Sequence, residues 1–170
     1  MVSGGRIILG SQVLDNDQPN AAAGVVRAFD AHTGTLLWAW SPLPPGETDQ
    51  ALAPAGELYA RNTPNVWSAM SVDNEHGLIF VPTGNAQPDH YGGMRKGLDY
   101  YGSSVVALNA ATGKVVWHFQ TVHHDLWDYD VPAQPVLFDF PTDHSPVPAL
   151  AQATKQGNIF ILNRVKFPLF

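Results

Sequence analysis

The sequence repeats itself with a period of 79 residues, and this repeat limits the fold more than any other feature. Residues 26–38 (VRAFDAHTGTLLW) match residues 105–117 (VVALNAATGKVVW). Each copy predicts a strand, a tight Thr-Gly turn and a second strand that contains a tryptophan, Trp38 or Trp117. Glycine supplies the positive φ that such a turn needs. Because both tryptophans recur with the repeat, we expect them to be structural and to pack one unit on the next.

Short strand-like runs, separated by glycine and proline, extend the repeat to a unit of about four strands. The segment 6–10 ahead of the first copy corresponds to 78–82 ahead of the second. Further runs are predicted at 25–30, 36–40, 77–82, 104–109, 114–120, 135–138 and 158–163, and a third unit begins at 147–150. A propeller blade usually has ~40–50 residues. The insertions 41–64 and 87–102 account for the greater length of this unit.

Repeated four-stranded antiparallel units predict an all-β chain with β-propeller architecture, in which each sheet buries its faces against its neighbours. Residues 1–170 hold about two and a half units, whereas closed propellers have roughly 4–8 blades. We therefore expect a propeller fragment with no separate second domain. A β-sandwich is the alternative architecture, but it does not explain self-similarity over so long a period.

Charge and hydropathy disfavour several classes of protein. The formal net charge is −6, which argues against a nucleic-acid partner. No run approaches the roughly 18 uninterrupted apolar residues of a membrane helix. The N-terminus leads straight into the strand-like run 7–9 and does not resemble a signal peptide. The absence of cysteine excludes disulfides and thiolate metal sites.

The segment 123–130 (HHDLWDYD) has the highest concentration of titratable and aromatic side chains in the chain. It places two imidazoles, three carboxylates and two aromatic rings within eight residues. Pro132 and Pro135 then restrict the backbone that follows. A carboxylate held beside apolar rings has a tunable pKa, which a general base requires. A solvated acidic turn is the alternative on these residues alone.

Four motifs, in this order on the repeat, resemble the quinoprotein dehydrogenases that use pyrroloquinoline quinone (PQQ). They are the Thr-Gly-x-x-x-Trp repeats, Thr83-Gly84-Asn85, the segment 124–128 (HDLWD) and the segment 155–158 (KQGN). The segment 121–128, followed by 132–135, is most similar to the membrane-bound glucose dehydrogenase branch. Related quinate, shikimate and polyol dehydrogenases share much of it. The resemblance runs from about residue 5 to residue 164, and it implies an eight-bladed propeller that binds PQQ with Ca²⁺ or Mg²⁺ near its axis.

The resemblance also implies a role for individual residues. Asp128 matches the catalytic base and is expected beside the metal. Asn85 matches an amide that ligates the metal and borders the cofactor. Trp67 matches the tryptophan that stacks on the PQQ rings, and Lys155 matches the basic side chain at the quinone oxygens.

These residue types suit the chemistry of the implied ligands. PQQ is a flat, tricarboxylated ring system, so it needs an aromatic platform and compensating charge. A hard divalent cation prefers oxygen ligands, which Asp and Asn supply. Asp15 and Asn16 resemble an acidic–amide pair near the metal, so Asp15 is expected as a metal ligand and Asn16 at the cofactor.

Each role has a structural alternative. On the residues alone, Trp67 fits a buried core position and Lys155 a solvated surface. His123 and His124 are of a type that ligates metals, but we expect them to orient the loop, because hard cations prefer oxygen. Two further carboxylates, Asp125 and Asp130, are expected to cap turns or pair locally.

The sequence therefore predicts part of a PQQ-dependent sugar or polyol dehydrogenase, most similar to the glucose type. By resemblance, it oxidises an alcohol by base-assisted hydride transfer to PQQ and passes electrons to a membrane quinone. The same resemblance implies the periplasmic face of the bacterial inner membrane. The alternatives are a quinate/shikimate or polyol dehydrogenase of the same family, a non-catalytic propeller scaffold, and a hydrolase with a carboxylate pair, Asp125 and Asp128.

The end of the chain departs from the family pattern. After Asn163 and Arg164 the family continues with another Thr-Gly turn and a tryptophan, whereas this chain continues with residues 165–170 (VKFPLF). We therefore expect the remaining blades and a membrane anchor to lie outside these 170 residues. Activity is expected of the full-length protein and not of this fragment alone.

Overall fold

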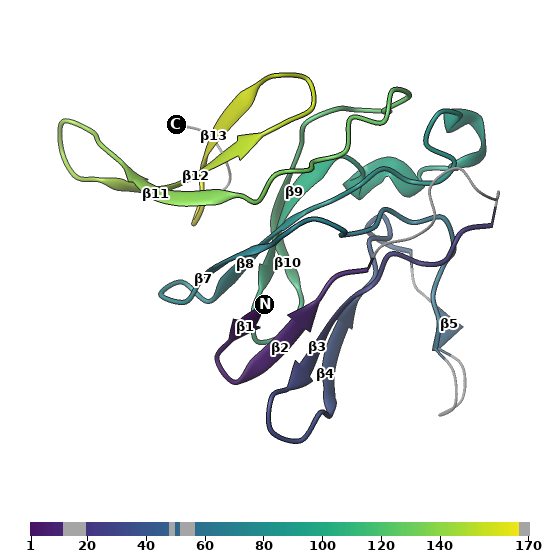
Figure 1. Cartoon of the computed structure of the whole chain (residues 1–170), viewed down its shortest axis with the longest axis horizontal. Helices are drawn as coiled ribbons and strands as arrows, with labels where there is room; N and C mark the ends of the chain where they lie inside the picture. Colours follow the sequence, from purple (N-terminus) through teal and green to yellow (C-terminus); the bar gives the residue numbers. More distant parts are fainter. Residues whose placement is uncertain (12–19, 48–49, 52–56, 167–170) are drawn as a thin grey trace.

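The computed structural model describes residues 1–11, 20–47, 50–51 and 57–166, and it is built mainly from antiparallel strands. The first sheet joins β1 (Val2–Ser3), β2 (Arg6–Leu9), β3 (Val26–Asp30) and β4 (Leu36–Trp40). The second joins β7 (Ser71–Asp73), β8 (Leu78–Pro82), β9 (Ser104–Asn109) and β10 (Val115–Gln120). The third joins β11 (Val136–Phe140), β12 (Val147–Ala153) and β13 (Ile159–Asn163). Figure 1 shows the three sheets following one another in chain order, from purple through teal to yellow.

This arrangement confirms the predicted unit: two four-stranded sheets and a partial third. Every predicted strand-like run falls on a strand, whereas β1 and β7 lie outside the predicted runs because two or three residues are too short to show alternation. The insertion 41–64 contains β5 (Gln50–Ala51) and β6 (Glu57–Leu58), which pair with each other. The insertion 87–102 contains two 3₁₀ turns, η1 (Gly92–Met94) and η2 (Leu98–Tyr101).

No helix in the described part of the chain is long and apolar enough to cross a membrane.

The two repeat tryptophans occupy equivalent places, as predicted. Trp38 pairs with Ala28 across β4 and β3, and Trp117 pairs with Ala107 across β10 and β9. In both ladders the register shifts by one residue just before the tryptophan. The indole of Trp38 donates a 3.1 Å hydrogen bond to the carbonyl of Ala110, which directly follows β9 of the next sheet. The indole of Trp117 likewise reaches the third sheet, so each tryptophan joins its own sheet to the following one.

The turns after the third strand of each unit also match. Asp30 Oδ1 accepts the Thr33 amide at 2.8 Å, and Asn109 Oδ1 accepts the Thr112 amide at 3.1 Å. Asn163 Oδ1 accepts the Lys166 amide at 2.9 Å, although no Thr-Gly follows it. A short polar side chain at the strand end is enough to start the turn, because it satisfies the amides that follow. The third unit therefore begins the same turn from a different sequence.

The second sheet lies between the other two and is buried on both faces. Alternate residues of β8 and β9 point to opposite sides, as the pleat requires. Ile79, Val81, Val106 and Leu108 pack with residues of the first sheet, such as Ile8. A second cluster joins the opposite face to the third sheet, and its members are Leu78, Phe80, Val105, Ala107, Trp117, Val131, Leu150 and Leu162. This two-sided burial explains why β8 reads as a continuous apolar run.

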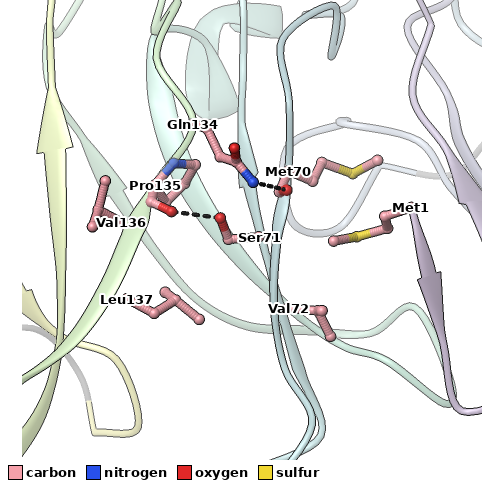
Figure 2. A pocket seen from close by; sticks show the side chains of 8 residues that line it. All are labelled: Met1, Met70, Ser71, Val72, Gln134, Pro135, Val136 and Leu137. Carbon is pink, nitrogen blue, oxygen red and sulfur yellow. Dashed lines mark hydrogen bonds between the residues drawn. The ribbon is translucent and has the colours of Figure 1, made fainter.

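The first strands of neighbouring sheets are linked by side chains that reach across to backbone. Figure 2 shows the hollow between β7 and β11, with Met1 at its side. Gln134 Nε2 donates to the carbonyl of Met70 at 3.0 Å, and Ser71 Oγ donates to the carbonyl of Pro135. These bonds fix the segments that lead into β7 and β11, and both segments carry candidate site residues.

Gly113→Ala is expected to lower the free energy of unfolding by about 2–5 kcal/mol. Gly113 has a φ of +70°, and an added Cβ would lie 2.5 Å from the Trp38 ring. The left-handed backbone alone costs a non-glycine residue roughly 1–2 kcal/mol, and overpacking adds roughly 1–3 kcal/mol. The control is Gly77→Ala, where φ is +65° but nothing lies within 4 Å, so only the backbone cost applies. Thermal unfolding of both variants of the complete protein measures the difference. Equal losses of stability in the two variants would contradict a packing clash between the added Cβ and Trp38.

Arg164→Met is expected to lower the free energy of unfolding by about 2–3 kcal/mol, because it removes bonds between the second and third sheets. Arg164 Nε donates to Asp73 Oδ2 at 2.7 Å, and Arg164 also donates to the carbonyl of Phe138. Burial raises the pKa of Asp73, but the bonds from Arg164 and His76 outweigh it and hold that pKa below its ordinary value. The stabilisation that the ionised Asp73 carboxylate contributes is therefore fully present above about pH 3.9, the ordinary Asp pKa. It is lost as the pH falls through the lower pKa that Asp73 has in the folded protein.

Thermal unfolding at pH 7 and near pH 3 checks this expectation. The difference in unfolding temperature between wild type and Arg164→Met should be smaller near pH 3 than at pH 7. Lys166→Met removes an exposed cation two residues further on and serves as the control. An equal difference in unfolding temperature at both pH values would contradict a stabilising bond between Arg164 and the Asp73 carboxylate.

Candidate functional site

The structure brings together four of the predicted site residues from four separate connections. Trp67 lies ahead of β7, and Asn85 follows β8. Asp128 lies between β10 and β11, and Lys155 lies in the turn between β12 and β13. The ends of the second and third sheets therefore supply all four residues. The two other predicted residues, Asp15 and Asn16, lie outside the described residues.

The carboxylate of Asp130 lies at the centre of this group. Its Oδ2 accepts the Trp67 Nε1–H at 2.8 Å, and its Oδ1 accepts the backbone N–H of Asn85 at 2.6 Å. Lys155 Nζ lies 3.9 Å from the same Oδ2. Asp130 is only 5% exposed. The expectation that Asp130 caps a turn or pairs locally is therefore wrong, because its partners lie 63 and 45 residues away in the sequence.

The pKa of Asp130 is raised to about 6, mainly by burial and to a smaller extent by the nearby charge of Asp128. The hydrogen bond from Trp67, the charge of Lys155 and the amide of Asn85 act in the opposite direction but are weaker. In the sequence, the only indication that Asp130 belongs to the site is its place two residues after Asp128, in the Asp-Tyr-Asp segment 128–130. That spacing alone does not say which distant groups the second carboxylate meets.

Asp128 and Lys155 form a half-exposed ion pair beside Asp130. Lys155 Nζ donates to Asp128 Oδ2 at 3.0 Å and to the Asp128 carbonyl at 2.8 Å. Asp128 has a φ of +59°, in the left-handed region that Asp tolerates better than most residues. Such a backbone is held in place by its surroundings and is common at functional sites. The Asp128 side chain remains 38% exposed, so a ligand can reach it.

Trp67 differs from the repeat tryptophans in its exposure. Its side chain is 42% exposed, whereas Trp38 and Trp117 are 8% and 4% exposed. Its indole nitrogen is fixed by Asp130, so the ring is oriented while part of its surface stays open. The expectation of a buried core position, drawn from the residue type alone, is therefore wrong. An oriented, open aromatic ring can stack on a flat ligand.

Asn85 is fully buried and joins the site through its backbone. Its side-chain nitrogen donates to the carbonyls of Asp89 and Asp125, at 3.3 and 3.1 Å. Its Oδ1 accepts the N–H of Ala86 at 2.9 Å. A carbonyl oxygen has two lone pairs, so ligation of a cation by Asn85 would use the second.

Asp125 organises the loop that carries Asp128. It is 2% exposed and accepts the Trp127 amide at 2.9 Å, the Tyr129 amide at 2.6 Å and the Ser103 hydroxyl at 2.7 Å. These bonds agree with the expected turn-capping role. They occupy both carboxylate oxygens with fixed donors, so the geometry gives no support to a hydrolytic pair with Asp128.

The two histidines contact polar side chains at the loop edge. His124 Nδ1 lies 2.9 Å from Asp99 Oδ2, and His123 Nδ1 lies 2.8 Å from Gln120 Oε1. Within the described ranges, no three His, Asp or Glu side chains cluster as a metal site. This arrangement agrees with the expectation that the histidines orient the loop.

The insertion 87–102 supports this loop, although its sequence gave no sign of that function. A Cβ on Gly92 would lie 2.3 Å from the His124 ring, so the two segments pack tightly. Arg95 is 1% exposed and donates to the carbonyls of Asp89 and Pro88. The insertion is therefore an ordered support for the Asp128 loop.

Comparison with known proteins places the chain among enzymes of one type. A family model described as "PQQ: Glucose/ethanol/alcohol dehydrogenase, beta-propeller domain" matches residues 1–166. The glycerol dehydrogenase large subunit of Gluconobacter oxydans is 45% identical over 166 residues, which are 96% of this chain and 22% of that protein. The quinate/shikimate dehydrogenase (quinone) of Acinetobacter baylyi is 43% identical over 96% of this chain and 20% of its own length. The quinoprotein glucose dehydrogenase of Escherichia coli is 43% identical over 93% of this chain and 20% of its own length.

A solved structure agrees with these sequence matches. The quinohemoprotein alcohol dehydrogenase ADHIIG of Pseudomonas putida HK5 superposes with a TM-score of 0.77 and 28% identity, and the match covers 96% of this chain and 25% of that one. The chain thus spans about a fifth of the length of the curated relatives it matches. With the family model matching residues 1–166, the chain belongs to the PQQ-dependent quinoprotein dehydrogenases and corresponds to part of their β-propeller domain.

Proposed function

We propose that residues 1–170 are one portion of a single propeller domain in a PQQ-dependent sugar or polyol dehydrogenase, with the glucose type as the first choice. One observation carries the proposal: Trp67, Asp128, Asp130 and Lys155 meet at one place on a chain of this family. A propeller scaffold has no need to hold an open tryptophan, two carboxylates and a lysine together. This supports an enzyme over the scaffold alternative.

The side chains present fit the cofactor and cation that the family uses. The open Trp67 ring fits a flat ring system, and the Lys155 ammonium fits an anionic or carbonyl oxygen. Asp128 and Asp130 face a single lysine, which leaves one surplus negative charge in the group. A divalent cation that prefers oxygen ligands compensates such a surplus. We propose that Asp128 and Asn85 contact this cation.

When bound, PQQ with its cation supplies an electrophilic acceptor for the hydride of the alcohol carbon. The other tasks belong to the protein. Asp128 takes the proton of the substrate hydroxyl, because its carboxylate is accessible and held in a fixed backbone. Lys155 holds this carboxylate and its carbonyl in place before the ligand arrives. Trp67 orients the ring system from one side.

The proposal extends to the electron acceptor and to the place of reaction. Electrons pass to a membrane quinone on the periplasmic face of the inner membrane, with the membrane anchor outside these 170 residues. A dehydrogenase for glucose is the first choice of substrate. The three relatives reported above, named for glycerol, quinate/shikimate and glucose, are 43% to 45% identical to this chain, so the test includes one substrate of each class.

The test is reconstitution of the complete, cofactor-free enzyme with PQQ and either Ca²⁺ or Mg²⁺. We expect PQQ to bind, and dye reduction to require PQQ, the cation and one alcohol among glucose, glycerol and quinate. A chelator should abolish the activity, and fresh cation should restore it. Absence of PQQ binding would favour the scaffold alternative, whereas binding without turnover on glucose would move the assignment to another substrate class.

A further inference from the structure

We propose that Asp130 is a positioning residue that fixes the Trp67 ring for PQQ; this rests on the proposed function. The 2.8 Å bond from Trp67 Nε1 to Asp130 Oδ2 uses the only hydrogen-bond donor of the indole. The ring is otherwise 42% exposed, and an exposed side chain is free to change rotamer. The bond therefore decides which way the open face of the ring points.

A second contact makes this bond part of a short ladder between two loops. Ser68 Oγ donates to the carbonyl of Val131 at 3.2 Å, one residue after each partner of the Trp67–Asp130 bond. The other carboxylate oxygen of Asp130 and the backbone of the next residue also form hydrogen bonds. Its Oδ1 accepts the Asn85 amide, and the Val131 amide donates to the carbonyl of Thr83 at 3.2 Å. Asp130 is thus fixed between the loop ahead of β7 and the loop after β8.

The contacts require a carboxylate at this position. Two N–H donors approach Asp130, one at each oxygen. A carboxylate accepts at both oxygens, whereas an amide accepts only at one and presents its own N–H₂ group at the other. Asp130→Asn therefore keeps the size of the side chain and sets a donor against either Trp67 or Asn85. A buried, unsatisfied polar group of this kind is costly.

A double-mutant cycle in the complete enzyme tests the proposal through binding of PQQ. The proteins are wild type, Asp130→Asn, Trp67→Phe and the double variant, each prepared without cofactor. The dissociation constant of PQQ is measured by equilibrium dialysis, so the readout does not depend on turnover. We expect Asp130→Asn to weaken PQQ binding by roughly 10-fold alone and by less than about 3-fold in the Trp67→Phe background. Turnover at saturating PQQ should fall less than the affinity.

The fluorescence of the cofactor-free proteins gives a second readout. The difference between wild type and Trp67→Phe isolates the emission of Trp67, and Asp130→Asn should shift that emission. If Asp130→Asn fails to fold, Trp67→Phe decides alone: removal of the indole donor should weaken PQQ binding several-fold, and unchanged affinity would overturn the proposal.

The remaining outcomes separate this proposal from the proposed function. Equal losses of PQQ affinity in both backgrounds would mean that Asp130 acts on the cofactor or cation directly and not through Trp67. An unchanged dissociation constant in Asp130→Asn would also overturn the positioning role. Both outcomes leave the proposed function intact, because wild type still binds PQQ. Failure of wild type to bind PQQ would overturn both.

Discussion

Asp128→Asn is expected to lower the turnover number of the complete enzyme by roughly 10²–10⁴-fold while PQQ remains bound. The amide has nearly the same size as the carboxylate but cannot accept the hydroxyl proton at neutral pH. Lys155 Nζ keeps its 2.8 Å bond to the carbonyl of residue 128, so the backbone of the loop should stay in place. The loss should therefore fall on turnover and leave cofactor affinity within a few-fold of wild type.

Turnover measured against PQQ concentration checks this expectation. Asp143→Asn makes the same chemical change at an exposed position and should have no effect. Near-normal turnover of Asp128→Asn at saturating PQQ would show that Asp128 is not the base, even in a chain of this family. A large rise in the PQQ dissociation constant would instead point to a binding role for the carboxylate.

The repeat made the sheets predictable because the same physical constraints act on every unit. A strand whose two faces are both buried must be apolar throughout, so β8 was visible in the sequence. The turn after each third strand needs a short polar side chain, and Asp30 and Asn109 supply it in the repeated segments. Among the described strands, the short ones β1, β5, β6 and β7 escaped detection, because they owe their pairing to the neighbouring strand and not to their own pattern.

The candidate site was only partly predictable because its central contacts are long-range. Family motifs pointed to Trp67, Asn85, Asp128 and Lys155 one by one. They did not reveal that the carboxylate of Asp130 joins two of these residues by hydrogen bonds and faces a third. The support given by the insertion 87–102 was also hidden, because its glycine and arginine act through close packing and burial. Local sequence shows which groups are present, but only the fold shows which of them meet.

Trp67→Ala should produce a different effect from the loss of the base. It removes an aromatic surface that is fixed at one edge and open on its face, so weaker PQQ binding should dominate. The stacking and burial of such a ring are worth about 1.5–3 kcal/mol, which corresponds to roughly 10–100-fold in the dissociation constant. Asp128 and Lys155 keep their ion pair, so turnover at saturating PQQ should stay within a few-fold of wild type.

The matched control is Trp127→Ala, which removes a 65% exposed indole from the loop beside Asp128. Its contact in the structure is with the ring of Tyr129, so PQQ affinity should change little. A thermal scan separates both variants from a structural loss such as Trp38→Ala, which should lower the unfolding temperature because that indole packs between sheets. If Trp67→Ala binds PQQ as tightly as wild type, the ring is not the platform. The open tryptophan would then need another ligand, and the resemblance would no longer locate the cofactor on this chain.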